Sequence, residues 1–87
     1  MKVYMKHIKM IAWFTEHGML TPLKFQIQGS DNDLVTIKVD NITERAEEKL
    51  AGNRMMIYRC QSEIDGLEKV YELKYEVGTC KWYLYKM

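Results

Sequence analysis

Residues 55–75 read MMIYRCQSEIDGLEKVYELKY, and the dipeptide Asp65-Gly66 near the centre of this stretch decides the fold. Asp-Gly is typical of a type I′ turn, which joins two antiparallel strands in a hairpin. With these two residues at the centre of the turn, one face of the hairpin is almost entirely apolar, and a shift of one residue would destroy this separation. The pattern therefore predicts one register, with the pairs Ile64–Leu67, Ser62–Lys69, Cys60–Tyr71, Arg59–Glu72, Tyr58–Leu73, Ile57–Lys74 and Met56–Tyr75.

The connection after this hairpin leaves two registers open. A four-residue loop over 76–79 places the even-numbered residues from Cys80 to Leu84 on the apolar face, whereas a three-residue loop with a bulge at Gly78 places the odd-numbered residues there. We favour the four-residue loop, because it buries Trp82 and Leu84 together, and we expect Trp82 at the centre of the core. The expected pairs are then Tyr75–Cys80, Leu73–Trp82 and Tyr71–Leu84.

Alternating patterns also predict strands over 3–14, 23–28 and 35–39, with a turn at 16–18 and a loop at 29–33. A chain of 87 residues has room for one small core. About six antiparallel strands in such a chain should curl on themselves. We therefore expect one mainly all-β domain over 1–87, a six-stranded antiparallel barrel or strongly bent sheet of the SH3-like or OB-like kind.

The alternation stops between 41 and 53. Asn41 and Glu44 have the spacing of a capping box, while Ile42, Ala46 and Leu50 would share one helical face. These features predict a short helix over about 42–51, and a charged loop is the alternative.

Composition excludes several classes of protein. Apolar residues make up 47% of the chain and the net charge is +1, which is typical of neither a disordered tail nor a strongly basic nucleic-acid binder. No run approaches the ~20 apolar residues that span a bilayer, and Lys9 interrupts the one stretch that resembles a signal peptide. Two cysteines are too few for a secreted disulfide scaffold, so we expect a cytoplasmic protein that does not bind membranes.

The sequence predicts no catalytic, cofactor or metal site. Cys60 and Cys80 lack the close spacing of zinc ligands, and we expect both as buried, reduced thiols. His7 and His17 have no nucleophile or orienting group at a recognisable spacing, so we expect surface histidines. We therefore expect a protein that is not an enzyme.

An interaction surface is the favoured functional interpretation. On the outer face of the last three strands we expect Ile57, Arg59, Val70, Tyr83 and Tyr85, with Val70 opposite Tyr85 and with Glu72 opposite Tyr83. Tyr and Arg are enriched at protein interfaces. If the last strand is an edge, a homodimer or a partner protein could cover this surface. We therefore expect a non-enzymatic protein-interaction or regulatory module.

The alternative is a small barrel that binds single-stranded nucleic acid, in which aromatic side chains stack on bases and cations contact phosphates. Tyr83 and Tyr85, with Lys81, Lys86 and Arg59, would form the binding surface. Residues 1–28 are the most basic part of the chain, with four Lys and one Glu.

One resemblance spans much of the chain. The stretch AGNRMMIYRCQS (51–62), together with YELKYE (71–76) and TCKW (79–82), resembles short uncharacterised bacterial proteins of unknown function. The resemblance implies a bacterial cytoplasmic origin, and it carries no activity or site.

Overall fold

The computed structural model describes residues 1–29 and 31–87, which form seven antiparallel strands and no helix. The strands are β1 (Val3–Phe14), β2 (Leu20–Gln28), β3 (Leu34–Lys38), β4 (Asn41–Leu50), β5 (Asn53–Ile64), β6 (Leu67–Glu76) and β7 (Lys81–Lys86). The all-β, barrel-like class is confirmed, with seven strands in the described residues instead of six. The loop expected at 29–33 includes Ser30, which lies outside the described residues.

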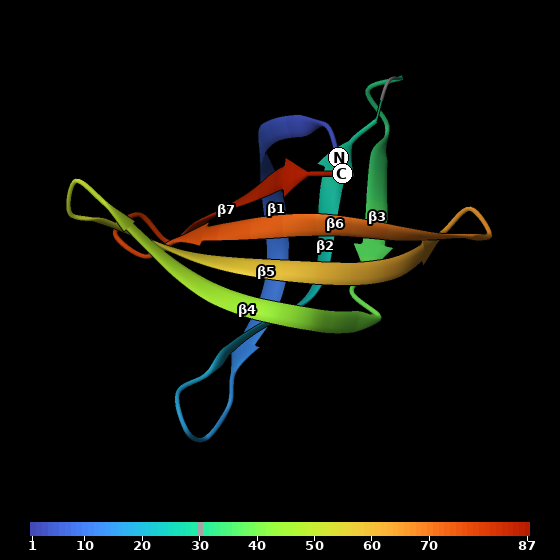
Figure 1. The fold of residues 1–87 in the computed structure, drawn as a ribbon. Helices are drawn as coiled ribbons and strands as arrows, with labels where there is room; N and C mark the ends of the chain where they lie inside the picture. Colours follow the sequence, from blue (N-terminus) through green and yellow to red (C-terminus); the bar gives the residue numbers. More distant parts are fainter. Residues whose placement is uncertain (30) are drawn as a thin grey trace.

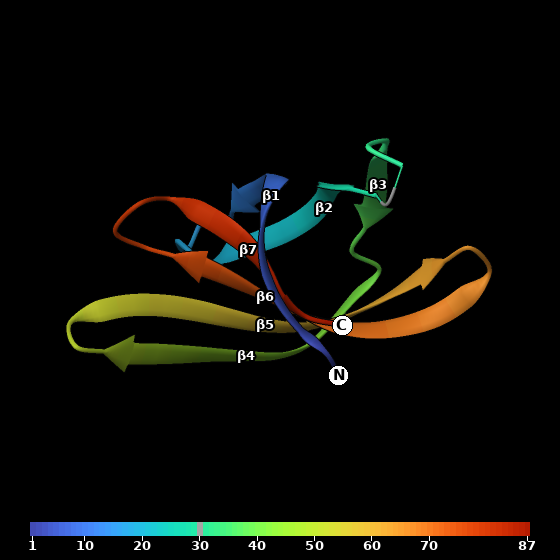
Figure 2. The same cartoon turned by 90° about the horizontal axis from the view of Figure 1, so that it is seen from above.

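The strands form one sheet in the order β3-β2-β1-β7-β6-β5-β4. The sheet curls into a half-barrel, so that β1 and β2 cross behind β4, β5 and β6 in the view of Figure 1, and the two halves of the sheet also face each other from above in Figure 2. The first and last strands pair in the middle of the sheet. This pairing places the two termini side by side, where Lys2 and Met87 exchange two backbone hydrogen bonds.

One end of the half-barrel is closed by the connection between β3 and β4. Val39 N donates a hydrogen bond to Leu23 O, and Asp40 N donates one to Gln61 O. The hydroxyl of Ser62 on β5 donates to Lys38 O at 2.6 Å. Along the rest of their length, β3 and β4 are the two free edges of the sheet over the described residues, so the opposite end of the half-barrel is open.

The concave face of the sheet carries the core. Its buried members come from both halves of the sheet and are Phe25, Ile37, Tyr58, Cys60, Tyr71, Leu73, Trp82 and Leu84. Trp82 packs against Tyr58 and Tyr75, with ring centroids 5.5 and 5.0 Å apart. Burial of Trp82 is therefore confirmed, as the apolar alternation of the last strand indicated.

The predicted register of the β5–β6 hairpin is confirmed at every pair. Asp65 and Gly66 have φ values of 51° and 79°, the pair of positive angles that a type I′ turn requires. The turn at 16–18 is also confirmed, since Gly18 N donates to Thr15 O and Gly18 has a φ of 83°.

The predicted register between β6 and β7 is wrong by two residues. The loop spans 77–80 instead of 76–79, and the observed pairs include Tyr75–Trp82, Leu73–Leu84 and Lys74–Tyr83. Because two residues are one full period of a strand, Trp82 and Leu84 stay on the concave face. Cys80 instead lies in the turn, exposed, with a φ of 60°, so its predicted burial is wrong. The expected Val70–Tyr85 and Glu72–Tyr83 pairs are also wrong, because Glu72 lies opposite Lys86.

The predicted helix over 42–51 is wrong as well, because β4 occupies this region and pairs with β5. The register shifts between Ile42 and Glu44, which leaves Thr43 as an extra residue. This bulge breaks the alternation that would otherwise mark a strand.

The last strand, β7, is not an edge, because it pairs with both β1 and β6. In the described residues, no helix has the length and apolar character to cross a membrane.

Candidate functional site

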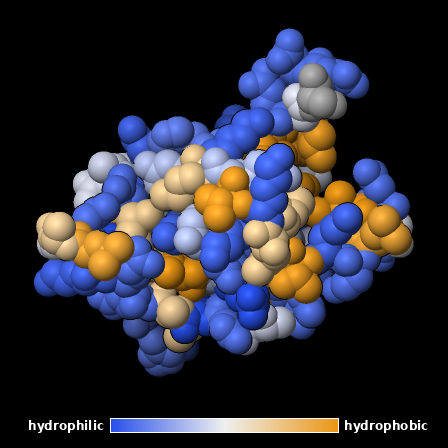
Figure 3. Space-filling model, turned by 45° about the horizontal axis from the view of Figure 1, so that its top comes forward, coloured by the Kyte–Doolittle hydropathy of each residue, from blue (hydrophilic) through white to orange (hydrophobic). Residues whose placement is uncertain are grey.

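The five residues of the predicted interaction surface lie on the convex face of β5, β6 and β7. Ile57, Arg59, Tyr83 and Tyr85 are half-buried, and Val70 is exposed. Ile57 and Tyr83 lie on either side of Lys74 in the sheet, whereas Val70 lies opposite Gln61, beyond the end of β7. On the face shown in Figure 3, apolar side chains form several small patches divided by hydrophilic ones. The convex face therefore offers no single large apolar surface in that view.

The two tyrosines of this surface are engaged within the chain. Lys74 Nζ lies 3.8 Å from the ring centroid of Tyr85, and Lys86 Nζ lies 4.8 Å from it. The ring of Tyr83 packs against His7 at 4.6 Å, and its hydroxyl donates to Glu76 Oε1 at 3.5 Å. These contacts satisfy much of the cation–π and hydrogen-bonding capacity of both rings.

Arg59 and Glu72 form the expected cross-strand ion pair, with Nη2 and Oε2 3.4 Å apart. Nε of Arg59 is buried and has no hydrogen-bond partner among residues 1–29 and 31–87. Within the nucleic-acid surface expected on this face, Lys81 lies opposite Glu76. Carboxylates thus stand beside two of the expected cations, Arg59 and Lys81, and would repel a phosphate backbone.

A groove that the sequence reasoning missed lies at the open end of the half-barrel. It encloses about 450 Å³ between the β1–β2 hairpin and the strands β4, β5 and β6. The lining residues are Phe14, Gly18, Met19, Leu20, Arg45, Arg54, Met56, Tyr58, Tyr75 and Val77. A volume of this size is within the range of small-ligand and side-chain pockets.

The walls of the groove are mostly apolar and partly exposed. Phe14 and Met19, which flank the turn of the β1–β2 hairpin, are 66% and 51% exposed. Tyr58 forms part of the floor, and its hydroxyl donates to Leu20 O at 2.8 Å, which joins the two halves of the sheet. Exposed apolar side chains around a concave site are the usual mark of a binding surface.

Two arginines line this groove and differ in whether they form an ion pair. Arg54 makes a two-pronged ion pair with Glu47, with Nε–Oε1 and Nη2–Oε2 distances of 2.6 and 3.2 Å, and this hydrogen bonding lowers the pKa of the Glu47 carboxyl. Arg45 instead lies over the ring of Tyr58, 5.8 Å from its centroid, and donates to Thr21 Oγ1 at 3.4 Å. Within the described part of the chain, no carboxylate lies within ion-pair distance of Arg45.

The cysteines and histidines form no reactive cluster in the described residues, where no three metal-binding side chains come together. Cys60 is fully buried, and desolvation raises the pKa of its thiol to about 12, against a smaller opposing effect of Arg45. His7 lies on β1 against Tyr83, and His17 lies in the β1–β2 turn with its Nε2 3.5 Å from Glu16 Oε1. Among the described residues, the two histidines thus lie beside a tyrosine and a glutamate, without the nucleophile and orienting group that catalysis needs.

The groove depends on tertiary structure and not on a motif. The one signal in the sequence is the pair of large apolar residues, Phe14 and Met19, on both sides of a polar turn. Comparison of the chain with protein-family models, with curated proteins and with solved structures finds no match. The geometry of the molecule is therefore the basis on which a function is proposed.

Proposed function

We propose that this chain is a non-enzymatic interaction module, which binds an extended segment of a partner protein in the groove at the open end of the half-barrel. The observation that carries this proposal is the state of Arg45, which lies at the edge of an exposed apolar groove and has no carboxylate within ion-pair distance among residues 1–29 and 31–87. The partner segment would insert an aromatic or aliphatic side chain and place an acidic side chain beside Arg45.

The apolar part of this preference follows from the groove walls. Phe14 and Met19 lose water-exposed apolar area when a side chain enters, and each buried Å² contributes roughly 25 cal/mol. Tyr58 and Tyr75 are held by their contacts with Trp82, so the floor is already ordered before binding. An ordered floor reduces the entropy that binding would cost.

The preference for an acidic side chain in the partner follows from the contrast between the two arginines. Glu47 already neutralises Arg54, so a second carboxylate there would meet a negative charge. Arg45 offers guanidinium donors whose observed hydrogen-bond acceptor is the hydroxyl of Thr21. A carboxylate can accept two parallel hydrogen bonds from a guanidinium, which gives both strength and orientation.

The groove has better support than the outer tyrosines as the interaction surface. Tyr83 and Tyr85 are covered in part by Glu76, His7, Lys74 and Lys86, whereas Phe14 and Met19 project from the β1–β2 hairpin. Self-association through Tyr83 and Tyr85 stays a prediction. Light scattering tests it, since a species above 10.4 kDa should return to monomer in a folded variant with both tyrosines changed to Glu.

Selection from a library of random 12-residue peptides displayed on phage tests the groove proposal. We expect selected peptides to contain Asp or Glu near an aromatic or aliphatic residue. The variant Arg45→Gln should lose the acidic preference, and Phe14→Ser should lose binding. Leu67→Ser is the matched control, because Leu67 is 60% exposed but lies in the distant β5–β6 hairpin. Selected peptides that bind Phe14→Ser as well as they bind the unaltered chain would overturn the proposal.

The alternative class, a binder of single-stranded nucleic acid, draws its support from a different surface. That surface is the outer face of β1, β2 and β3, where the chain has lysines and an exposed tryptophan but no carboxylates on the strands.

A further inference from the structure

The described strands β1, β2 and β3 contain no Asp or Glu, although every other described strand except β7 carries at least one. The acidic residues of 1–38 are confined to the loops, as Glu16, Asp31 and Asp33. The net charge of the whole chain is small, but β1, β2 and β3 carry lysines and no carboxylates. A polyanion would meet no negatively charged side chain on these strands.

The register of these three strands brings their lysines onto one face. Ile11 lies opposite Lys24, and Lys24 lies opposite Lys38 across the β2–β3 pair. In the adjacent row, Lys9 lies opposite Gln26, which lies opposite Thr36. All six residues share the outer face, because rows two residues apart project from the same side of a sheet.

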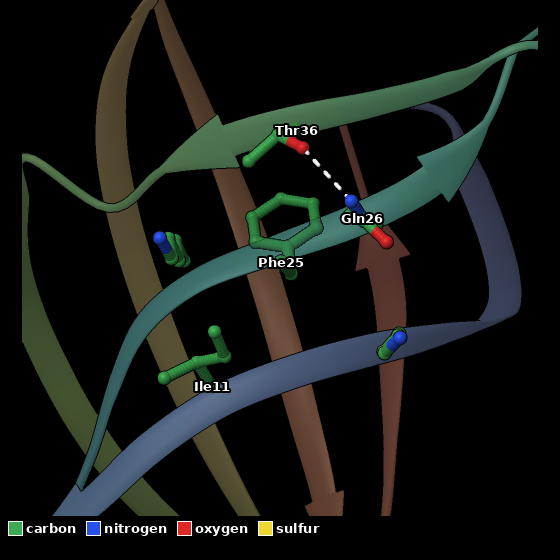
Figure 4. A pocket seen from close by; sticks show the side chains of 6 residues that line it. Ile11, Phe25, Gln26 and Thr36 are labelled. Carbon is green, nitrogen blue, oxygen red and sulfur yellow. Dashed lines mark hydrogen bonds between the residues drawn. The ribbon is translucent and has the colours of Figure 1, made fainter.

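A hollow of about 200 Å³ lies between these two rows. It is lined by Lys9, Ile11, Lys24, Phe25, Gln26 and Thr36, and Figure 4 shows these side chains. Gln26 Nε2 donates to Thr36 Oγ1 at 3.2 Å, as the dashed line in Figure 4 marks. The hollow therefore combines two ammonium groups with hydrogen-bonding groups held in place by each other.

This arrangement favours an anion on electrostatic grounds. Like charges directly opposite in a sheet repel each other, as Lys24 and Lys38 do. In the described residues, neither these two lysines nor Lys9 has a carboxylate within ion-pair distance. A phosphate between the rows would relieve this repulsion and accept hydrogen bonds from Lys9 and Lys24.

An aromatic side chain lies beside the cations. Trp13 follows Lys9 and Ile11 in the alternation of β1, so it belongs to the same outer face, and it is 58% exposed. Its neighbour Phe14 points to the opposite face and lines the groove. Bases of a single strand stack on exposed aromatic rings while lysines contact the backbone phosphates.

We propose that the outer face of β1, β2 and β3 binds single-stranded nucleic acid, with Lys9, Lys24 and Lys38 on the phosphates and Trp13 stacked on a base. This site is separate from the groove, and it differs from the surface around Tyr83 and Tyr85 that the sequence predicted. The difference lies in the carboxylates, because Glu72 and Glu76 accompany those tyrosines.

Fluorescence anisotropy of a labelled 20-residue oligothymidine, measured at several salt concentrations, tests this site. Three phosphate contacts predict a slope of about −2 for the logarithm of affinity against the logarithm of salt, which is about a 15-fold loss between 50 and 200 mM. Lys24→Gln combined with Lys38→Gln should reduce the slope to about −0.7. The same pair should not lower the melting temperature, because it removes a repulsion.

The neighbouring aromatic residues supply a matched pair of variants. Trp13→Ala should weaken oligothymidine binding roughly tenfold or more, as the loss of one stacked base does, and should leave peptide selection unchanged. Phe14→Ala should weaken peptide binding and should leave oligothymidine binding unchanged. Failure of the groove and failure of this site are therefore distinguishable in one set of measurements.

Three results would overturn the nucleic-acid site. One is the absence of binding at 50 mM salt. Another is oligothymidine binding that Trp13→Ala leaves unchanged. The third is inorganic polyphosphate that displaces the oligonucleotide with equal affinity per phosphate, because bases would then contribute nothing and the face would be a general polyanion surface.

Discussion

The side-chain oxygens of Ser62 and Tyr71 lie 2.5 Å apart at the closed end of the half-barrel, where both residues are fully buried. The serine hydroxyl already donates its one proton to Lys38 O, so the tyrosine must be the donor between them. Ser62 Oγ also accepts from Asp40 N at 3.4 Å. One serine thus connects β5 and β6 to the segment that closes the barrel.

We expect Ser62→Ala to destabilise the protein more than Tyr71→Phe. The alanine removes the acceptor of the buried Tyr71 hydroxyl and also the donor to the part-buried carbonyl of Lys38, which costs about 1–3 kcal/mol. The phenylalanine leaves Ser62 with two other hydrogen bonds, so the loss should be about 0.5–1.5 kcal/mol. Urea unfolding of both variants measures this order, and the reverse order would show that the donor assignment is wrong.

Trp82→Ala should cost about 3–5 kcal/mol of unfolding free energy, because it removes a buried indole that packs against Tyr58 and Tyr75. A domain of this size should then be largely unfolded at room temperature. Trp13→Ala is the control, since Trp13 is 58% exposed and its loss should change stability by less than about 0.5 kcal/mol. A Trp82→Ala variant with a native melting temperature would contradict the observed core.

The two cysteines should differ sharply in reactivity. Cys80 is exposed in the β6–β7 turn and should react with a thiol reagent in the native protein, whereas Cys60 should react only after unfolding. Native protein in which both thiols react at similar rates would argue against burial of Cys60. A Cys80→Ser variant isolates the slow thiol for this measurement.

The stability of the fold should fall in alkaline solution. Burial raises the pKa of Cys60 from 9.0 to about 12, and burial also raises the pKa of the Tyr71 hydroxyl, although its hydrogen bond with Ser62 opposes this. A raised folded pKa stabilises the protein fully below the unfolded pKa, and this contribution is lost as pH rises from about 9 through about 12. Cys60→Ala should flatten this part of the stability curve, and a curve that keeps its slope would assign the effect to other groups.

Gly66→Ala should destabilise the β5–β6 hairpin by about 1–2 kcal/mol, because Gly66 has a φ of 79° and alanine is strained there. Gly78→Ala is the matched control. No atom lies within 4 Å of a Cβ at that position, and its φ is not in the left-handed region. Thermal melts of the two variants should therefore separate, and equal melting temperatures would contradict the type I′ turn.

The β5–β6 hairpin could be predicted because local signals agreed there. Asp65-Gly66 demanded one turn type, and the apolar alternation on both sides allowed one register. The β6–β7 connection had the weaker signal, since a shift of two residues preserves the alternation and leaves Trp82 buried. Period-two reasoning identifies which face a residue occupies but not its partner across the sheet.

The strand β4 could not be predicted in the same way. Its residues Glu44, Glu47, Glu48 and Lys49 are good helix formers, and the bulge at Thr43 hides its alternation. Pairing with β5 overrides these local preferences. Charged side chains on a free edge also discourage pairing with other chains. Protection of the edge therefore accounts for a strand whose composition is typical of a helix.

The two candidate sites differ in how much of each can be recognised from a single stretch of sequence. The lysines of 1–28 are visible as a basic segment, but the absence of carboxylates beside them becomes clear only when Lys24 and Lys38 lie opposite each other. The groove has no sequence signal beyond Phe14 and Met19, because it requires Phe14 and Met56 to approach from separate halves of the sheet.

The central position of β7 has a consequence for how this protein is made. The six residues Lys81–Lys86 of β7 leave the ribosome after β1 to β6 have done so. They nevertheless join the β1–β3 half of the sheet to the β4–β6 half. A nascent chain that ends at Glu76 can form hairpins but has no strand with which to unite them. We expect such a chain to be degraded rapidly by proteases, and cooperative folding to begin only when the last strand is free to enter the gap.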